Sequence, residues 1–286
     1  MIILEESDCT SGTQAVGLQK NFSKTMDKKQ TLLNQSLAVR TFPLDEVKKI
    51  CDEFFLENHY EVSKPYSKIS DWLKPIVDLS EFKHFYPANG VTEGLNYWMM
   101  QEQRKIQTKS GEYAWVEGHE TGDMYYISCP SSVDGNFCEI PTDKPVVLDL
   151  AYIGSTAIKS LHIPDNVEKV FFSLSKSLGL RNYRIGYYWS RHSDPMLEKL
   201  IYSAKYYNYH SFALGEKIIE QIPVNFVYDK LSPIQHDLCK ELDLTPSDSL
   251  WLATTTDQAY NKFKRANTNR ICLSNLIESA YNDRSI

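Results

Sequence analysis

The segment EKVFFSLSKSLGLRNYRIGY, residues 168–187, carries more chemical information than any other part of the chain. Its apolar start predicts a strand that runs into Ser173-Leu174-Ser175-Lys176. Alternation along a strand places Ser173 and Ser175 on the same side, with Lys176 where the strand ends. The glycines that follow let the loop fold back close to a ligand. These residues predict a site that combines anion binding with a reactive amine, although a lysine after a strand is often simply solvated.

The overall composition is that of an ordinary folded protein. The chain has 286 residues, 42% hydrophobic and 24% charged, and a formal net charge of -6. This length can bury one large domain, or a large domain and a small one. An acidic chain with no basic cluster argues against nucleic acid as a partner, and no apolar run is long enough to span a membrane. The first residues, MIILEESDCTSG, do not resemble a secretory signal, so we expect a cytoplasmic protein.

The cysteines and histidines show no metal-binding pattern. There is no CxxC, HxH or HExxH motif, and the seven histidines are scattered, so we expect no metal site. A bridge between Cys129 and Cys138 would close a predicted turn, but reduced thiols are favoured in a long chain without a signal peptide. The six cysteines are Cys9, Cys51, Cys129, Cys138, Cys239 and Cys272.

The pattern along the chain predicts an α/β protein in which short strands alternate with helices. Residues 1–40 are polar and lack periodicity, as in an N-terminal arm. A change of pattern after about residue 193 indicates a large domain over residues 41–205 and a small one over 206–286. The predicted helices are Leu44–Phe55, Val91–Arg104, Leu197–Tyr206, Phe212–Ile222, Ile234–Leu242 and Gln258–Arg265. The predicted strands are Tyr113–Val116, Met124–Ser128, Pro145–Leu150, Val170–Ser175, Ile185–Ser190, Ser249–Thr254 and Asn269–Ser274.

Two segments supply groups that suit an anion. Asn89-Gly90-Val91-Thr92 lies where a loop enters a helix, so unpaired N–H groups, the helix dipole and the Thr92 hydroxyl favour a negative charge. The alternative is a helix N-cap without a ligand. Arg184, eight residues after Lys176, adds a guanidinium that can hold a phosphate through paired hydrogen bonds.

A carboxylate interrupts the apolar run Val146–Leu150. Burying a charge is costly unless it is paired, so Asp149 either caps the next turn or faces a cation. Tyr152, three residues later, can point its hydroxyl at the same ligand. Amine, carboxylate, phenol and phosphate cradle together are the groups that pyridoxal phosphate requires.

The chain resembles the fold-type I, class I/II pyridoxal-phosphate-dependent aminotransferases, as a compact member. The resemblance rests on NGVTEGL (89–95), YISCPSSVDG (126–135), DLAY (149–152), SLSK with Arg184 (173–184) and NRICLS (269–274). The motifs follow the family's order and cover about residues 85–275. The resemblance implies a three-layer large domain with a mainly parallel sheet, a small C-terminal α/β domain and a homodimer.

The resemblance also implies a role for each matching residue. Lys176 matches the lysine that forms the Schiff base and moves the proton at the substrate Cα. Asp149 matches the partner of the ring nitrogen, Tyr152 the donor to the ring oxygen, and Arg270 the arginine that binds the substrate α-carboxylate. Strand alternation directs Arg270 inward, and the alternative is an exposed arginine. Tyr113 matches the aromatic that stacks on the ring, with Trp115 as its competitor. The matching phosphate and cofactor binders are Gly90, Val91, Thr92, Ser132, Ser173, Ser175 and Arg184.

The chain departs from the family pattern in three places. Thirteen residues separate Gly135 from Asp149, too few for the helix that the family has there. The Asn-Pro-x-Gly turn is replaced by Ser132-Val133-Asp134-Gly135; Asn136 is an alternative to Ser132 for the missing asparagine. The tyrosine that a second subunit usually contributes has two candidate counterparts, Tyr60 and Tyr66.

The function predicted first is transfer of an amino group between an amino acid and an α-keto acid. The same cofactor also supports β-elimination, racemisation or cyclisation, and the altered turn keeps these alternatives open. A third alternative is a non-catalytic relative that binds the cofactor or a partner protein. The residues that would recognise the substrate side chain are not ranked; Arg181, Tyr209 and His210 are candidates.

Overall fold

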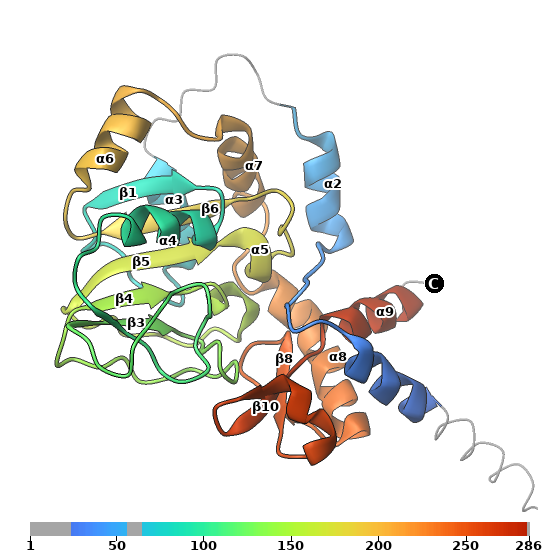
Figure 1. Ribbon diagram of the computed structural model, residues 1–286. Coiled ribbons are helices and arrows are strands. Elements are labelled where there is room, and N and C mark those ends of the chain that lie inside the picture. Colours follow the sequence, from blue (N-terminus) through green and yellow to red (C-terminus); the bar gives the residue numbers. More distant parts are fainter. Residues whose placement is uncertain (1–23, 56–64, 285–286) are drawn as a thin grey trace, which may run out of the picture.

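A six-stranded sheet forms the centre of the protein. The computed structural model describes residues 24–55 and 65–284. The strands follow the order β1-β6-β5-β4-β3-β2 (Figure 1). Strands β2 to β5 pair in parallel, while β6 runs antiparallel to both β5 and β1. The bounds are β1 His84–Ala88, β2 Ile106–Gln107, β3 Met124–Ser128, β4 Val146–Asp149, β5 Val167–Ser173 and β6 Gly186–Ser190.

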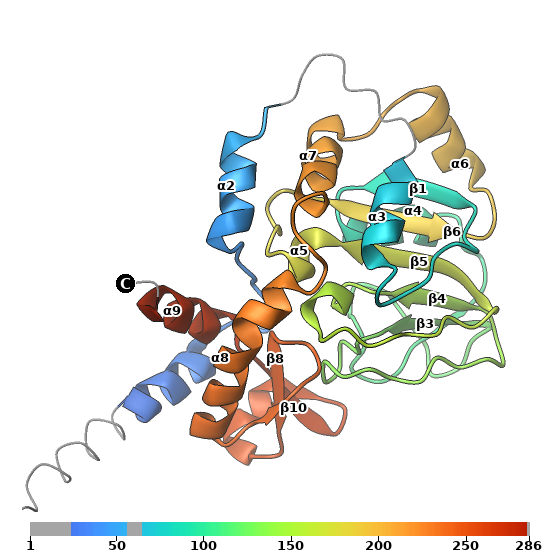
Figure 2. The ribbon, with the colours of Figure 1, turned by 180° about the vertical axis from the view of Figure 1, so that it is seen from behind.

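Helices cover both faces of this sheet, which explains why its strands read as continuous apolar runs. Neighbouring residues of β5 point to opposite faces: Phe171 stacks on Tyr188, and Phe172 stacks on Tyr187. Helix α4 (Val91–Met99) covers the first face, where a Cβ at Gly94 would touch Phe171. Helices α3 (Pro65–Leu73) and α7 (Tyr209–Ile219) cover the second face (Figures 1 and 2). The predicted three-layer α/β architecture with a mainly parallel sheet is confirmed.

The C-terminal part has a second, smaller sheet, again as predicted. Its antiparallel strands follow the order β7-β8-β10-β9. The buried Gln235 side chain in α8 donates to three backbone carbonyls around β8 and so fixes the helix to the sheet. The bounds are β7 Thr245–Pro246, β8 Leu252–Thr255, β9 Lys264–Arg265, β10 Thr268–Cys272, α8 Phe226–Leu242, α9 Ser274–Arg284 and the 3-10 helix η3 Gln258–Phe263.

Short elements complete the described chain. Residues 24–34 are helical. The others are α2 Asp45–Glu53, the 3-10 helix η1 Ile153–Ser155, α5 Leu174–Ser177, α6 Pro195–Leu197 and the π-helix η2 Glu198–Ser203.

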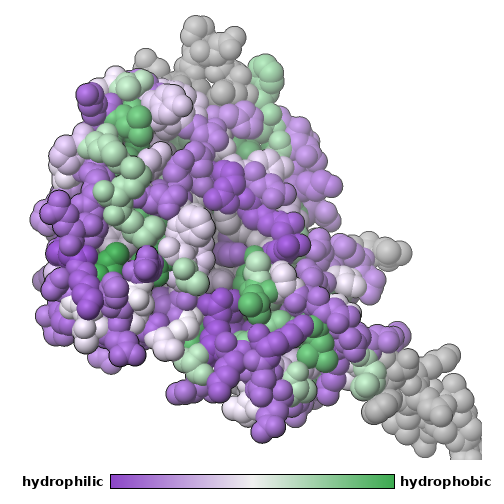
Figure 3. Space-filling model, viewed as in Figure 1, coloured by the Kyte–Doolittle hydropathy of each residue, from purple (hydrophilic) through white to green (hydrophobic). Residues whose placement is uncertain are grey.

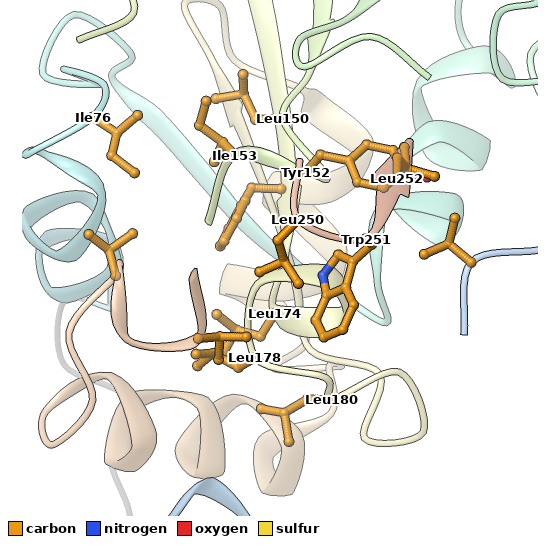
Figure 4. Close-up of a cluster of buried hydrophobic side chains, with 14 of the residues drawn as sticks. Ile76, Leu150, Tyr152, Ile153, Leu174, Leu178, Leu180, Leu250, Trp251 and Leu252 are labelled. Carbon is orange, nitrogen blue, oxygen red and sulfur yellow. The ribbon is translucent and has the colours of Figure 1, made fainter. Parts of the chain in front are cut away.

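A shared hydrophobic core joins the two parts (Figure 4). Leu150 and Ile153 follow β4, Leu174 and Leu178 belong to or follow α5, and all four are fully buried. They belong to the same cluster as the buried Trp251 of the small part, whose indole N–H donates to the carbonyl of Lys176 at 2.7 Å. The small part therefore packs directly against the segment that carries the predicted reactive lysine.

One predicted strand is wrong. Residues Tyr113–Val116 form a turn, because their N–H groups are used locally: Tyr113 donates to the Glu112 carboxylate and Val116 to the Tyr113 carbonyl. The strand at this edge is β2 instead. The prediction relied on aromatic β-propensity, which is weak evidence without cross-strand partners.

Other boundaries differ from the prediction. Strand β5 ends at Ser173, two residues before the expected end, and α5 begins there. Helix α8 begins well before Ile234 and contains Pro233. Strand β1 and helix α3 had no counterpart in the prediction. The connection between β3 and β4 contains no helix, as the short spacing predicted. Residues 1–23 of the predicted arm and Tyr60 lie outside the described residues.

The described surface gives no sign of a membrane span or metal centre. No helix among the described residues is long and apolar enough to cross a membrane, and no cluster of metal-binding side chains occurs among them. The face seen in Figure 3 is mainly hydrophilic, with apolar residues in small separate groups.

Truncating Phe172 tests the packing of the central strand. Phe172 is fully buried against Trp72 and Tyr187. We expect Phe172→Ala to lower the free energy of unfolding by about 3–5 kcal/mol, because the helices on this face cannot close the cavity. Phe55→Ala is the control, since Phe55 is 84% exposed. Denaturant unfolding measures both, and equal losses would contradict this account of the core.

Candidate active site

A cavity of about 320 Å³ lies where β4 and β5 end, between the sheet, the start of α4 and strand β10. It brings together residues that are far apart in sequence, and its volume suits a small-molecule ligand. A larger cavity, of about 550 Å³, lies on the other side of Arg184. Of the residues predicted to act in catalysis or to bind the cofactor or the α-carboxylate, Arg184 alone lines it, together with Tyr209, one of the unranked candidates for recognising the substrate side chain. The predicted residues around the first cavity are Val91, Thr92, Tyr113, Ser132, Asp149, Tyr152, Ser173, Ser175, Lys176, Arg184 and Arg270.

Lys176 lies in the short helix α5, directly after the end of β5. Its ammonium group donates to the Val39 carbonyl at 2.5 Å. Burial lowers the pKa of Lys176 to about 8, because removal from water disfavours the charged form. Ser173 and Ser175 both line the cavity, although the helical turn, rather than strand alternation, brings them to the same side. A usable fraction of the Lys176 amine is therefore neutral at physiological pH.

Asp149 ends β4 and is 4% exposed. Its two oxygens accept hydrogen bonds from the Tyr126 hydroxyl at 2.7 Å and the Ala151 N–H at 2.8 Å. Burial raises the pKa of this carboxyl to about 6. The residue therefore caps the next turn, which is the first of the two alternatives, and it also lines the cavity. A buried carboxylate without an ion pair is well placed to stabilise a cationic ligand group.

Tyr152 lies against the same cavity and is 8% exposed. Burial raises the pKa of its phenol to about 12. The group is therefore neutral at physiological pH and can donate a hydrogen bond.

The start of α4 and Arg184 meet beside the cavity, where the sequence predicts a cradle for an anion. Gly90 is the N-cap, has a φ of +86° and provides no side chain to the first N–H groups of the helix. Arg184 donates to the Asn89 carbonyl at 2.7 Å. A Cβ at Gly90 would lie 2.5 Å from the Arg184 guanidinium, and one at Gly186 would lie 2.4 Å from the Gly90 Cα. Glycines at both positions thus let the guanidinium and the helix N-terminus meet.

The aromatic residue beside this cradle is Tyr113. Its hydroxyl lies 3.2 Å from the Thr92 hydroxyl, and its side chain lines the cavity. The competing Trp115 is 53% exposed and donates to Asn96 instead.

Arg270 enters the cavity from β10 and is 7% exposed, which excludes the alternative of a surface arginine. Its guanidinium donates to the carbonyls of Ser132 at 2.6 Å and Leu37 at 3.1 Å. Its Nε–H is buried without a partner among the described residues. An unpaired buried donor on a cation favours an anionic ligand.

The turn that replaces the family asparagine is tied to a buried carboxylate. The Ser132 and Ser128 hydroxyls both donate to Glu112, which is 8% exposed. Asn136 is bonded to Asp248 in the small part and does not line the cavity. In this arrangement the Ser132 hydroxyl is directed to Glu112.

The cavity is also lined by residues that were not predicted from the sequence: the segment Leu37-Ala38-Val39 and Arg265. Residues 37–39 lack periodicity and have apolar side chains, so only their backbone positions reveal a role. Arg265 lies in a hairpin whose charge pattern is that of an ordinary surface. Arg181, one of the unranked candidates for reading the substrate side chain, also lines the cavity.

Solved structures share this architecture. No protein-family model matches the chain, and no curated protein matches its sequence. Tyrosine aminotransferase from Leishmania infantum matches with a TM-score of 0.61 at 12% identity, over 97% of this chain and 100% of that one. The chain has the fold of fold-type I pyridoxal-phosphate enzymes.

The fold-type I structures that match include more than one activity. Histidinol-phosphate aminotransferase from Sinorhizobium meliloti matches with a TM-score of 0.58 at 13% identity, over 85% of this chain and 90% of that one. A C-S lyase from Staphylococcus hominis matches with a TM-score of 0.57 at 11% identity, over 85% of this chain and 88% of that one. Both are described with pyridoxal phosphate bound. At identities this low the structural matches establish the fold alone, so the reaction has to be inferred from the residues of the site.

The reactivity of Lys176 tests its environment. We expect reductive methylation of Lys176 to rise with pH and reach half its maximum near pH 8, because the neutral amine is the nucleophile and burial favours it. A lysine in a short peptide, with a pKa of about 10.4, is the control. Mass spectrometry of the Lys176 peptide measures the reaction. A midpoint close to that of the free peptide would mean that Lys176 is solvated.

Proposed function

We propose that the protein is a pyridoxal-phosphate-dependent aminotransferase. The observation that carries this proposal is the convergence of an amine, a buried carboxylate and a phenol, Lys176, Asp149 and Tyr152, on one cavity. The first residues of α4, Val91 and Thr92, and Arg184 line the same cavity, next to the N-cap Gly90. The histidinol-phosphate aminotransferase and the C-S lyase that share this fold bind pyridoxal phosphate.

The residues present fit this cofactor. Its phosphate would be held by the first N–H groups of α4, Thr92, Ser173 and Arg184, with Ser175 as an additional hydroxyl. The close approach of Gly90 and Gly186 leaves the backbone open to such a group. Tyr113 would lie against the cofactor ring, and the backbone of the turn at Ser132 would also lie beside the ring.

When bound, pyridoxal phosphate supplies an aldehyde that takes up amino groups and a ring that withdraws electrons from the substrate Cα. Asp149 would hold the proton on the ring nitrogen, since a buried carboxylate stabilises an adjacent cation. Tyr152 would donate its proton to the ring oxygen. Lys176 would attach the cofactor and then move the proton at the substrate Cα, for which a pKa near 8 is suitable.

Arg270 would bind the α-carboxylate of the amino acid through its guanidinium. The first substrate would leave as an α-keto acid, while its amino group would stay in the active site. A second α-keto acid would then accept this amino group.

A homodimer and a cytoplasmic location remain predictions.

β-Elimination is the second candidate function. The C-S lyase match and the turn at Ser132 favour it, because the Ser132 hydroxyl donates to Glu112 rather than into the cavity. In β-elimination the proton is removed from Cα, the substituent on Cβ leaves with the bonding electron pair, and the remainder of the substrate is released and hydrolysed to a keto acid and ammonia. Both functions use Lys176 to move the Cα proton, so the products must separate them.

Replacing Lys176 tests catalysis directly. We expect purified protein with pyridoxal phosphate to show a visible absorbance band, and Lys176→Ala to lose both this band and at least about a hundredfold in turnover. Lys240→Ala, a change at an exposed lysine in α8, is the control. Full turnover of every substrate by Lys176→Ala would refute a catalytic role for the lysine.

Product analysis decides between the two reactions. Transfer should give a keto acid and convert the bound cofactor to its amine form in a single turnover, without ammonia. Ammonia with an unsaturated or deaminated product would instead establish elimination.

Gly186→Ala tests the cradle. Its Cβ would lie within 2.6 Å of the Gly90 backbone, so the loop before α4 must shift. We expect affinity for pyridoxal phosphate to fall about tenfold. Gly215→Ala in α7 is the matched control: it adds a similarly crowded Cβ, beside Tyr187 and Ile185 on the far face of the sheet. Titration of the visible band measures both, and unchanged affinity in Gly186→Ala would argue that the cradle does not hold the phosphate.

A further inference from the structure

The cavity carries more positive charge than the proposed reaction uses. Among the described residues around it, five side chains are cationic and Asp149 is the one carboxylate. On the proposed function, Lys176 binds the cofactor, Arg184 its phosphate and Arg270 the α-carboxylate. Two arginines remain without a role, Arg181 and Arg265.

Arg265 lies on the side of the cavity where the substrate would bind. It belongs to β9, which pairs with β10, the strand of Arg270. It is close enough to Arg270 and Tyr152 for their charges to interact, and burial together with Arg270 lowers the pKa of Arg265. Its Nη1 donates to the Gly111 carbonyl at 3.0 Å. This bond fixes the guanidinium and uses one of its five N–H donors.

No ion pair in the described chain includes Arg181, Arg265 or Arg270. The Glu112 carboxylate acts on the charge of Arg265 without forming an ion pair with it, and it accepts hydrogen bonds from the Ser128 and Ser132 hydroxyls. The guanidinium groups of Arg265 and Arg270 repel each other until an anion binds, and the Nε–H of Arg270 is a buried donor without a partner among the described residues.

Arg181 adds a further cation at the mouth of the same cavity. It lies in the loop between α5 and β6, is exposed, and acts on the charge of Lys176. No described residue accepts a hydrogen bond from its side chain. It is therefore available to a ligand that reaches beyond the Lys176 amine.

We propose that the amino-acid substrate carries a second anionic group on its side chain, bound by Arg265 with Arg181 as a supporting cation. The proposal rests on the aminotransferase function and names its substrate class. A carboxylate and a phosphate share the required chemistry, since both accept paired hydrogen bonds from a guanidinium. An amino acid with a neutral side chain would leave Arg265 beside Arg270 without a counter-charge.

Binding of amine-free analogues tests the proposal without requiring turnover. Succinate, butyrate and 3-phosphonopropionate differ in the second terminal group: a carboxylate, a methyl and a phosphonate. We expect the cofactor-loaded protein to bind succinate or 3-phosphonopropionate at least about tenfold more tightly than butyrate. The tighter of the two identifies the anion as carboxylate or phosphate. Equal affinities for all three would overturn the proposal.

Arg265→Gln should abolish this preference, measured as the ratio of the affinities for the dianion and for butyrate, and Arg265→Lys should restore part of it. Lys264→Gln is the matched control, because Lys264 is the exposed neighbour in β9 and does not line the cavity. A preference that survives in Arg265→Gln would overturn the assignment of Arg265. Arg181→Gln should reduce the preference less.

Two separate measurements distinguish failure of this proposal from failure of the proposed function. Calorimetry, with and without pyridoxal phosphate, measures the preference for the second anion. The absorbance spectrum measures the Lys176-dependent band, whose absence would refute the proposed function. Turnover gives the corresponding result: aspartate or phosphoserine should exceed alanine and serine in kcat/KM by about tenfold or more in the parent protein, and not in Arg265→Gln. Equal values in the parent protein would overturn the proposal.

Discussion

The parallel pairing of β4 with β5 is the constraint on which the site depends. In this register Asp149 lies opposite Phe171, so the carboxylate and the segment Ser173–Lys176 leave the sheet at the same edge. Parallel strands end on the same side, and helices on both faces bury them. A shift by one residue would turn Asp149 away from the cavity and bury it among apolar side chains. The apolar residues that fix the register therefore also fix the distance between the acid and the amine.

Antiparallel β6 completes this edge from the other direction. It begins at Gly186, where its backbone touches Gly90, and it follows the loop that carries Arg184. The anion cradle is thus built by the sheet itself, through the contact of two glycines, rather than by a flexible loop. The small part then closes the cavity with Arg270, and Trp251 bonds the backbone of Lys176. The charged groups of the site come from β4, α5, the loop before β6, β9 and β10, and the shared core keeps these elements together.

Much of this arrangement could be predicted from sequence. Strand β3 has the predicted bounds, β4 is one residue shorter than predicted at each end, and β6 is one residue shorter at its start, because continuous apolar runs between turns are typical of buried strands. Asp149 and Lys176 could be predicted because each is a charged residue that interrupts or follows such a run, and Tyr152 because it lies three residues after Asp149. Glu112 could not be found in this way, since its role depends on bonds to Ser128 and Ser132 across a turn. The false strand at Tyr113–Val116 has the same cause: its N–H groups bond locally, which composition does not reveal.

The segment that contains Leu37 and Val39 acts through its main chain. The Val39 carbonyl accepts a hydrogen bond from Lys176, and the Leu37 carbonyl accepts one from Arg270. Thr41 continues the attachment by donating to the Ser175 carbonyl. A lysine that forms a covalent bond to a cofactor can no longer keep all its protons, and an arginine that grips a carboxylate redirects its donors. On the proposed function, filling the cavity would compete with these backbone acceptors, so that occupancy of the site and the hold on the N-terminal segment would be thermodynamically linked.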